Sequence, residues 1–193
     1  MTTPCSVCGR APDPPARQRG ERRRFGPVER SGLGAELREA LAPVADYAAA
    51  RGVRLGVEPL NRYETSVVNT VAQGLEMLDG LPAEAIGLTL DTYHLNIEEQ
   101  DPAAAIRLAG AADRVAHVQV CANDRGAPGA DHMDWRAIRD ALVDVGYDGP
   151  LCIESFTAEN ESIATAASIW RPLARSQDAI ATDGLAFLHS LWA

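Results

Sequence analysis

Four side chains with ligating oxygens stand near the ends of four short apolar segments: Glu58, Asp91, Gln119 and Glu154. They are separated by 33, 28 and 35 residues along the chain, and a unit of strand, helix and parallel strand takes roughly 30 residues or more. Because the strands of a parallel barrel end at one face, we expect the four side chains to meet there. Carboxylates that end apolar strands are costly to bury unpaired, and one divalent cation would satisfy all of them.

The chemistry of this set is that of a hard cation site. Three carboxylates and an amide oxygen suit Mn(II) best, with Mg(II) and Co(II) as alternatives, whereas Zn(II) prefers more nitrogen or sulfur. The competing interpretation is that each acid caps the following helix or marks a solvated strand end, and for any single acid that interpretation is preferable. The recurrence of all four at the spacing of one repeat favours a shared site.

The elements that must position these residues alternate between apolar strands and amphipathic helices. Strands are predicted at 53–58, 86–91, 115–120 and 150–155. Helices are predicted at 36–51, from Asn69 or Thr70 onward, from Pro102 onward after the cap Asp101, at 135–145 after the cap Asp134, at 164–173 and at 178–192. This alternation is typical of parallel βαβ units, so the predicted fold class is α/β.

The composition excludes several classes of protein. The 193 residues include 18 basic residues, all Arg, and 27 acidic ones, which gives a net charge of −9. Without Lys there is no Schiff-base chemistry on a lysine amine, and the acidic balance argues against a nucleic-acid partner. The sequence shows no apolar run long enough to span a membrane and no secretory signal, so we expect no membrane association and a cytoplasmic location.

The amino-terminal segment differs from the rest of the chain. Residues 1–32 are rich in Arg and Pro and lack a periodic apolar pattern, which predicts a disordered tail before a domain over 33–193. Cys5 and Cys8 form a Cys-x-x-Cys pair within this tail, but no second pair completes a zinc site. Cys121 and Cys152 stand in apolar segments and are expected to be buried, reduced thiols.

Five motifs occur in an order that resembles a known superfamily. They are 57-VEPLNRYET-65, 90-LDTYHLNIEE-99, 117-HVQVCANDRGAPGADHMDW-135, 149-GPLCIESF-156 and 169-IWRPLARSQDAIATDGLAFL-188. The chain from about residue 35 onward is similar to sugar isomerases and epimerases with the xylose-isomerase-like (β/α)₈ barrel, and most of all to the ketose 3-epimerases for D-tagatose and D-psicose.

The resemblance implies one divalent metal held by Glu58, Asp91, Gln119 and Glu154. Ketose epimerases usually have a His-x-His pair on the third of these strands, whereas this chain has His117 and then Gln119. Both residues face the same way by strand alternation, so His117 remains the second candidate for the third ligand. Related hydroxypyruvate isomerases use Gln at this place.

The resemblance also implies a mechanism, the epimerisation of a free ketose at C3. One of Glu58 and Glu154 removes the proton beside the carbonyl, a cis-enediolate forms, and the other Glu returns a proton on the opposite face. Glu64, His94 and Arg125 would bind oxygens of the small-molecule sugar. As isolated residues, Glu64 and Arg125 could be solvated loop charges and His94 could cap the end of its strand, but their place within the matched motifs favours the functional interpretation.

A complete barrel of this type has eight strands, and four are predicted here, all resembling the second half. The predicted fold is therefore the C-terminal half of a (β/α)₈ barrel, with two open edges that favour a homo-oligomer. An inactive, amino-terminally truncated barrel domain is the alternative, as are activities like those of hydroxypyruvate isomerase or inosose dehydratase. Metal-dependent cleavage of DNA is disfavoured by the net charge and by the small number of His ligands.

Overall fold

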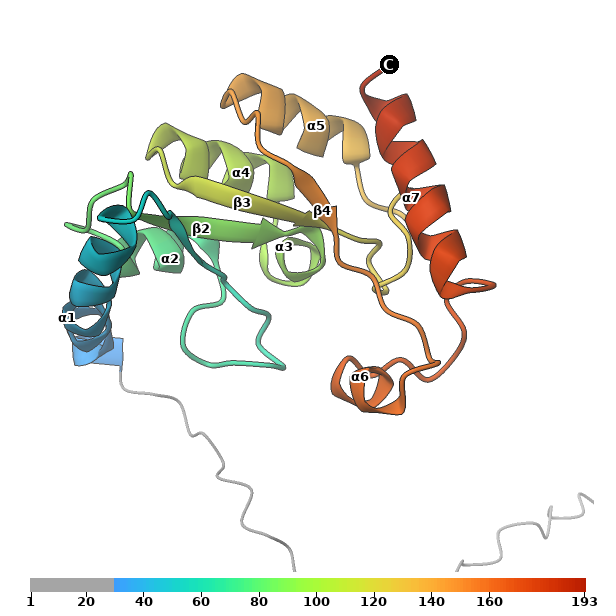
Figure 1. Ribbon diagram of the computed structural model, residues 1–193, viewed down its shortest axis with the longest axis horizontal. Helices are drawn as coiled ribbons and strands as arrows, with labels where there is room; N and C mark the ends of the chain where they lie inside the picture. Colours follow the sequence, from blue (N-terminus) through green and yellow to red (C-terminus); the bar gives the residue numbers. More distant parts are fainter. Residues whose placement is uncertain (1–29) are drawn as a thin grey trace, which may run out of the picture.

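The computed structural model describes residues 30–193 and contains a parallel sheet of four strands. The strands follow one another in the order of the sequence: β1 (Leu55–Val57), β2 (Ile86–Asp91), β3 (Val115–Val120) and β4 (Leu151–Ile153) (Figure 1). This is the predicted α/β architecture of about four βα units. Most of the predicted tail, including Cys5 and Cys8, lies outside the described residues.

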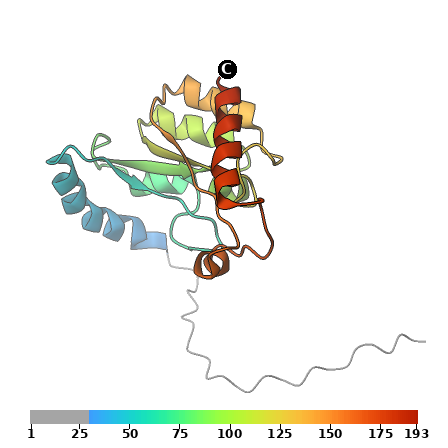
Figure 2. The ribbon, with the colours of Figure 1, turned by 45° about the vertical axis from the view of Figure 1, so that its right-hand side comes forward.

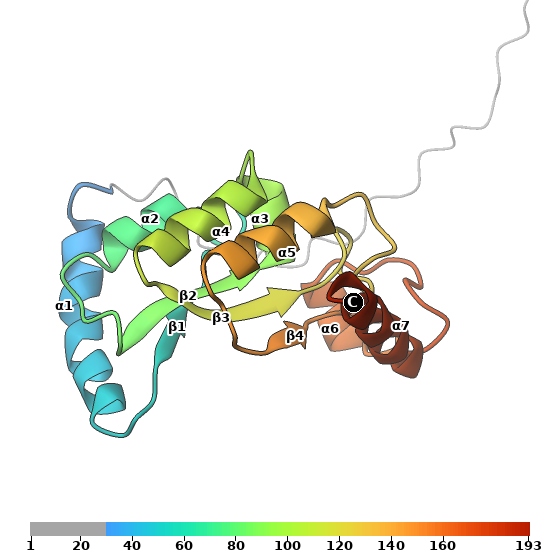
Figure 3. The same ribbon diagram turned by 90° about the horizontal axis from the view of Figure 1, so that it is seen from above.

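Helices alternate with the strands, and those between consecutive strands cover one face of the sheet. They are α1 (Arg30–Ala49), α2 (Val71–Met77), α3 (Thr92–Glu98), α4 (Pro102–Ala111), α5 (Trp135–Asp144), α6 (Glu161–Ala166) and α7 (Gln177–Leu191). Seen from above, α2, α4 and α5 form a row along one side of the strands (Figure 3). The last helix, α7, stands beside β4 at one edge of the sheet (Figure 2).

Strand alternation divides the sheet into an apolar face and a polar one. The side chains toward the helices belong to the buried core and include Leu88, Leu90, Val118 and Val120, all at most 1% exposed. The opposite face, which we call the inner face, carries the residues that alternate with them: Gly56, Thr89, His117, Gln119 and Cys152. The inner face therefore carries mainly polar or small side chains and no large aliphatic one among these positions.

The same alternation explains the surroundings of Gly56 on β1 and of Cys152 on β4. A Cβ atom on Gly56 would lie 2.2 Å from Oγ1 of Thr89, so any larger residue at position 56 would require the Thr89 side chain to move. Cys121 is buried as predicted, but the prediction is wrong for Cys152, which is exposed. Cys152 lies between two core residues on an edge strand and therefore points to the open inner face.

The helix starts follow the sequence signals. Thr70 makes a capping box with Gln73 at the start of α2, Asp101 caps α4 in front of Pro102, and Asp134 caps α5. Each side chain accepts a backbone N–H that has no partner within the helix. The predicted starts of these three helices are confirmed.

Several boundaries differ from the sequence predictions. Helix α1 begins at Arg30 rather than at residue 36, and the predicted helix 164–173 is replaced by α6, which Asn160 caps further upstream. The short helix α3 was not predicted. The central strands β2 and β3 have the predicted bounds, whereas β1 and β4 are shorter because each has one neighbour to pair with. No helix within residues 30–193 is both long and apolar enough to cross a membrane.

Candidate active site

The carboxyl ends of the strands deliver acidic side chains to one pocket. Glu58 directly follows β1, Asp91 ends β2, and Glu154 directly follows β4. A cavity of about 460 Å³ opens beside them. Its walls consist of residues that follow the strands and of one face of α6, namely Glu58, Leu60, Glu64, Tyr93, His94, Arg125, Glu154, Phe156, Ser162, Ile163, Ala166 and Ala167.

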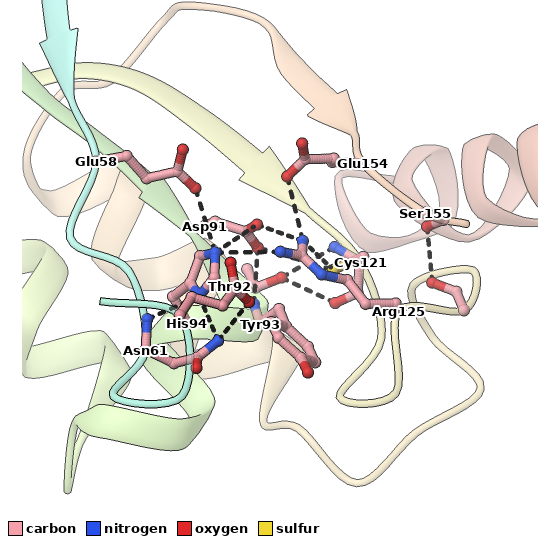
Figure 4. Close-up of polar contacts among 12 residues, drawn as sticks. Glu58, Asn61, Asp91, Thr92, Tyr93, His94, Cys121, Arg125, Glu154 and Ser155 are labelled. Carbon is pink, nitrogen blue, oxygen red and sulfur yellow. Dashed lines mark hydrogen bonds and ion pairs between the residues drawn. The ribbon is translucent and has the colours of Figure 1, made fainter. Parts of the chain in front are cut away.

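Arg125 joins two of the acids at the centre of this site (Figure 4). Its Nη1 donates to Oδ2 of Asp91 at 2.5 Å and to Oε2 of Glu154 at 3.1 Å. The guanidinium carbon lies 4.1 Å from the centre of the Tyr93 ring and 5.3 Å from that of Phe156, distances at which both rings attract the cation. The charge of Arg125 is thus held between two carboxylates and two aromatic rings.

A tight turn after β3 places Arg125. The N–H of Arg125 donates to the carbonyl of Ala122, and the N–H of Ala122 donates to that of Gly126. Within the turn Arg125 has a φ of 69°, the left-handed region that is unfavourable for residues other than glycine. Its carbonyl accepts the N–H of Phe156, which ties the turn to the segment after β4. The strain is held in place by these bonds and by the two ion pairs.

Burial alters the protonation of both candidate acid/base residues. The pKa of Glu58 is raised to about 7, first by burial and then by the neighbouring charges of Asp91 and Glu154. The pKa of Glu154 is also raised, chiefly by burial and by its proximity to Asp91. With a pKa of about 7, Glu58 can both take and give a proton at neutral pH.

His94 lies beneath Glu58 and is 2% exposed. Its Nε2 is 3.5 Å from Oε1 of Glu58 and 3.8 Å from Oδ2 of Asp91. The pKa of His94 is lowered to about 4, by burial first and by the positive charge of Arg125 second. The ring is therefore neutral at neutral pH.

The donor set fits a hard divalent cation. Glu58, Asp91 and His94 each offer a ligating atom, and these atoms lie within 4.8 Å of one another. Gln119 is the register partner of Asp91 in the sheet, and within the described residues its Oε1 is a buried oxygen without a hydrogen-bond partner. A buried acceptor beside a carboxylate is an atom that a cation would satisfy.

The predicted site residues are distributed as follows. Glu58, Asp91, His94, Arg125 and Glu154 contact one another directly or through Arg125. Glu64 lines the same cavity. His117 pairs with Thr89, two positions before the Gln119 and Asp91 pair, and so stands further from the carboxyl end of the sheet.

Other residues in or beside the pocket carried too little signal in the sequence to be singled out. Tyr93 and Phe156, which line the pocket, and Asn61, which lies behind it, all stand within the five motifs, near predicted site residues. Ile163 and Ala166 come from α6, and nothing local in the sequence shows that this helix returns to the pocket. Their place is decided by the path of the chain after β4.

Comparison with known proteins gives consistent matches. An L-ribulose 3-epimerase of Mesorhizobium japonicum is 42% identical over 151 residues, which are 77% of this chain and 50% of that protein. A D-psicose 3-epimerase of Agrobacterium fabrum is 34% identical over 157 residues, 81% of this chain and 54% of the relative. The chain thus spans about half the length of the curated relatives it matches.

Solved structures agree in fold. The structure of a D-allulose 3-epimerase from Methylomonas sp. in complex with D-allulose superposes with a TM-score of 0.77 at 34% identity, covering 86% of this chain and 57% of that one. The family model described as xylose isomerase-like TIM barrel matches residues 20–190. With four parallel βα units, the acidic residues at their carboxyl ends and this match over most of its length, the chain belongs to the xylose isomerase-like TIM barrel family.

Proposed function

We propose that this chain carries the catalytic half of a metal-dependent ketose 3-epimerase. The observation that carries this proposal is the pair Glu58 and Glu154, two carboxyl groups of raised pKa on either side of Asp91 in one pocket (Figure 4). Inversion at a carbon without redox chemistry requires an acid and a base on opposite sides of that carbon. The named activities of the matched relatives support the same reaction class.

The acid and base steps follow from the pocket residues. One Glu accepts the proton from C3 of the ketose, leaving a cis-enediolate, and the other Glu donates a proton to the opposite face of C3. The C–H bond that breaks is replaced by one C–H bond of inverted configuration, so atoms and charge balance. A divalent metal held by Glu58, Asp91, Gln119 and Glu154, with Mn(II) the best candidate, would make that C–H more acidic by polarising the adjacent carbonyl.

The charges that line the pocket favour an uncharged sugar. Glu58, Glu64 and Glu154 carry potential negative charge, and the one cation among the pocket residues, Arg125, is already paired with Asp91 and Glu154. A phosphate group would meet net negative charge, because the charge of the one guanidinium is already balanced by two carboxylates. We therefore propose a free ketose rather than a sugar phosphate as the substrate, with His94, Glu64 and Arg125 binding its oxygens.

The sheet has two edge strands that a second copy of the chain could pair with. β1 and β4 are the two edge strands, and each leaves one row of backbone N–H and C=O groups unpaired within the described part of the chain. Two copies related by a twofold axis along the strands could pair β4 of each with β1 of the other and close an eight-stranded barrel. We propose that the active form is such a homo-oligomer.

Incubation of the purified chain with Mn²⁺ and a panel of free ketoses in D₂O tests the function. The expected result is the C3 epimer of one of them, with deuterium appearing at C3 of the recovered substrate. Glu154→Gln should abolish this reaction. Glu159→Gln is its matched control and should keep the activity, because Glu159 is an exposed acid in the same segment after β4 that does not line the cavity. Absence of both epimer and deuterium at C3 from a metal-loaded chain would refute the assignment.

A further inference from the structure

A buried asparagine joins two of the residues that line the pocket. Asn61 is 1% exposed, and both ends of its side chain are engaged. Its Nδ2 donates to Oε1 of Glu64 at 2.8 Å and lies 3.0 Å from Nδ1 of His94. Its Oδ1 accepts the N–H of Tyr63 at 2.9 Å, which fixes the orientation of the amide. Asn61 itself does not line the cavity.

The same residue meets His94 with a second donor. The backbone N–H of Asn61 donates to Nδ1 of His94 at 3.0 Å. Two N–H groups of one residue therefore converge on Nδ1. A neutral imidazole has one nitrogen that donates and one that accepts, and the hydrogen bonds around it decide which is which. Nδ1 faces donors and must be the acceptor, so the proton resides on Nε2.

Nε2 has two acceptors and one donor near it, so the donors at Nδ1 decide the assignment. Two carboxylates, Glu58 and Asp91, lie 3.5 and 3.8 Å from Nε2, and their negative charge favours an N–H group at that atom. The third charged neighbour is Arg125, whose Nη2 is 3.1 Å from Nε2. Arg125 already donates through Nη1 to Asp91 and Glu154, so its place does not depend on an acceptor at Nε2.

We propose that Asn61 is a positioning residue: its two donors hold Nδ1 of His94 as an acceptor, so that His94 presents an N–H group, not a lone pair, to Glu58 and the pocket. Its amide holds Glu64 beside the same ring. A ring that presents Nε2–H cannot ligate a metal through Nε2, although that atom lies within ligand distance of Glu58 and Asp91. The role of His94 as a donor to a sugar oxygen rests on the proposed function, whereas the hydrogen bonding at Nδ1 does not.

The protonated nitrogen of His94 can be identified directly by ¹⁵N NMR of the histidine rings in the full chain at neutral pH. The expected result is a bare Nδ1 and a protonated Nε2, unchanged when Mg²⁺ is added as a diamagnetic probe. A protonated Nδ1 in the unmodified chain, or loss of the Nε2 proton on addition of Mg²⁺, would overturn the inference. This measurement needs no variant and no catalytic activity.

The variant Asn61→Asp tests whether the side chain of residue 61 determines which nitrogen of His94 is protonated. It places a carboxylate where the amide nitrogen contacts Nδ1 while the backbone N–H of residue 61 remains, so Nδ1 is expected to become partly protonated. Asn69→Asp is the matched control: Asn69 braces the same loop by donating to the carbonyls of Leu60 and Thr65 without contacting His94. In this control Nδ1 should stay bare. If Nδ1 stays bare in Asn61→Asp as well, the side chain of residue 61 does not determine which nitrogen of His94 carries the proton, and the inference is wrong.

Activity separates this inference from the proposed function. If the chain epimerises a ketose, Asn61→Asp should lower kcat by on the order of 100-fold, because the donor at the pocket is lost and Glu64 is repelled. If the chain shows the expected ring protonation but no epimerisation, the proposed function fails and the positioning of His94 by Asn61 stands.

Discussion

Asp91 and Arg125 form an ion pair at the centre of the pocket that is almost closed to solvent, with side-chain exposures of 0% and 7%. Asp91 also caps α3, since its Oδ1 accepts the N–H of Tyr93. One carboxylate thus ends a strand, starts a helix and neutralises the single cation among the pocket residues. The pair is structural and, under the proposed function, lies at the metal and substrate site.

Removing the cation should destabilise the chain and make its stability depend on metal. Arg125→Met leaves Asp91 buried without its partner, which costs about 3–5 kcal/mol of the free energy of unfolding. Mn²⁺ should recover more of this loss than it adds to the unmodified chain, because it can replace the missing positive charge. Urea unfolding with and without Mn²⁺ measures both effects.

The matched control for this variant is Arg107→Met. Its pair with Asp144 is exposed, at 43% and 56%, and exposed pairs contribute about 0–1 kcal/mol. If both variants lose the same stability, the pair between Asp91 and Arg125 is not the buried contact described above.

The raised pKa of Glu58 predicts a pH dependence of stability. Between the ordinary value of 4.5 and about 7, the folded chain keeps a proton on Glu58 that the unfolded chain has released. The native state then binds more protons, so the contribution of Glu58 to the free energy of unfolding falls as pH rises through this window and levels off above it. Urea unfolding of the metal-free chain should show this slope, and in Glu58→Gln the slope should be shallower, with the remainder due to Glu154. Equal slopes for the two would contradict the assignment.

Glu154→Gln separates metal binding from proton transfer. An amide oxygen can still ligate a cation but cannot carry a proton at neutral pH, so affinity for Mn²⁺ should be mostly retained while epimerisation is lost. Isothermal calorimetry and product analysis on the same preparation measure the two properties. Full turnover by this variant would exclude Glu154 as an acid or base.

The open edges predict association that depends on concentration. Sedimentation should show a mass that rises toward that of a dimer as the chain is concentrated. Cys152→Lys puts a charge on the inner face of an edge strand and should shift the equilibrium toward monomer. Val143→Lys, an exposed position of α5 on the other side of the sheet, should not. A chain that stays monomeric at all concentrations would rule out closure by a second copy.

Local sequence determined the two central strands, the starts of three helices and most of the pocket acids. Alternating apolar segments gave the bounds of β2 and β3, and short polar caps such as Thr70, Asp101 and Asp134 gave the starts of three helices. The spacing of Glu58, Asp91 and Glu154 placed them at one edge because parallel strands end together. These features depend on neighbours within a few residues or on the period of the repeat.

Tertiary structure decided which other residues contact those acids and which of the acids keep a proton. The turn that brings Arg125 between Asp91 and Glu154, the return of α6 over the pocket and the contact of Asn61 with Nδ1 of His94 all join residues about 30 or more positions apart. The raised pKa of Glu58 depends on burial by those same segments. The sequence alone could indicate which acids meet, because they recur at the spacing of one repeat. Their hydrogen bonds and protonation required the three-dimensional packing, because residues distant in the chain determine their burial and the charges around them.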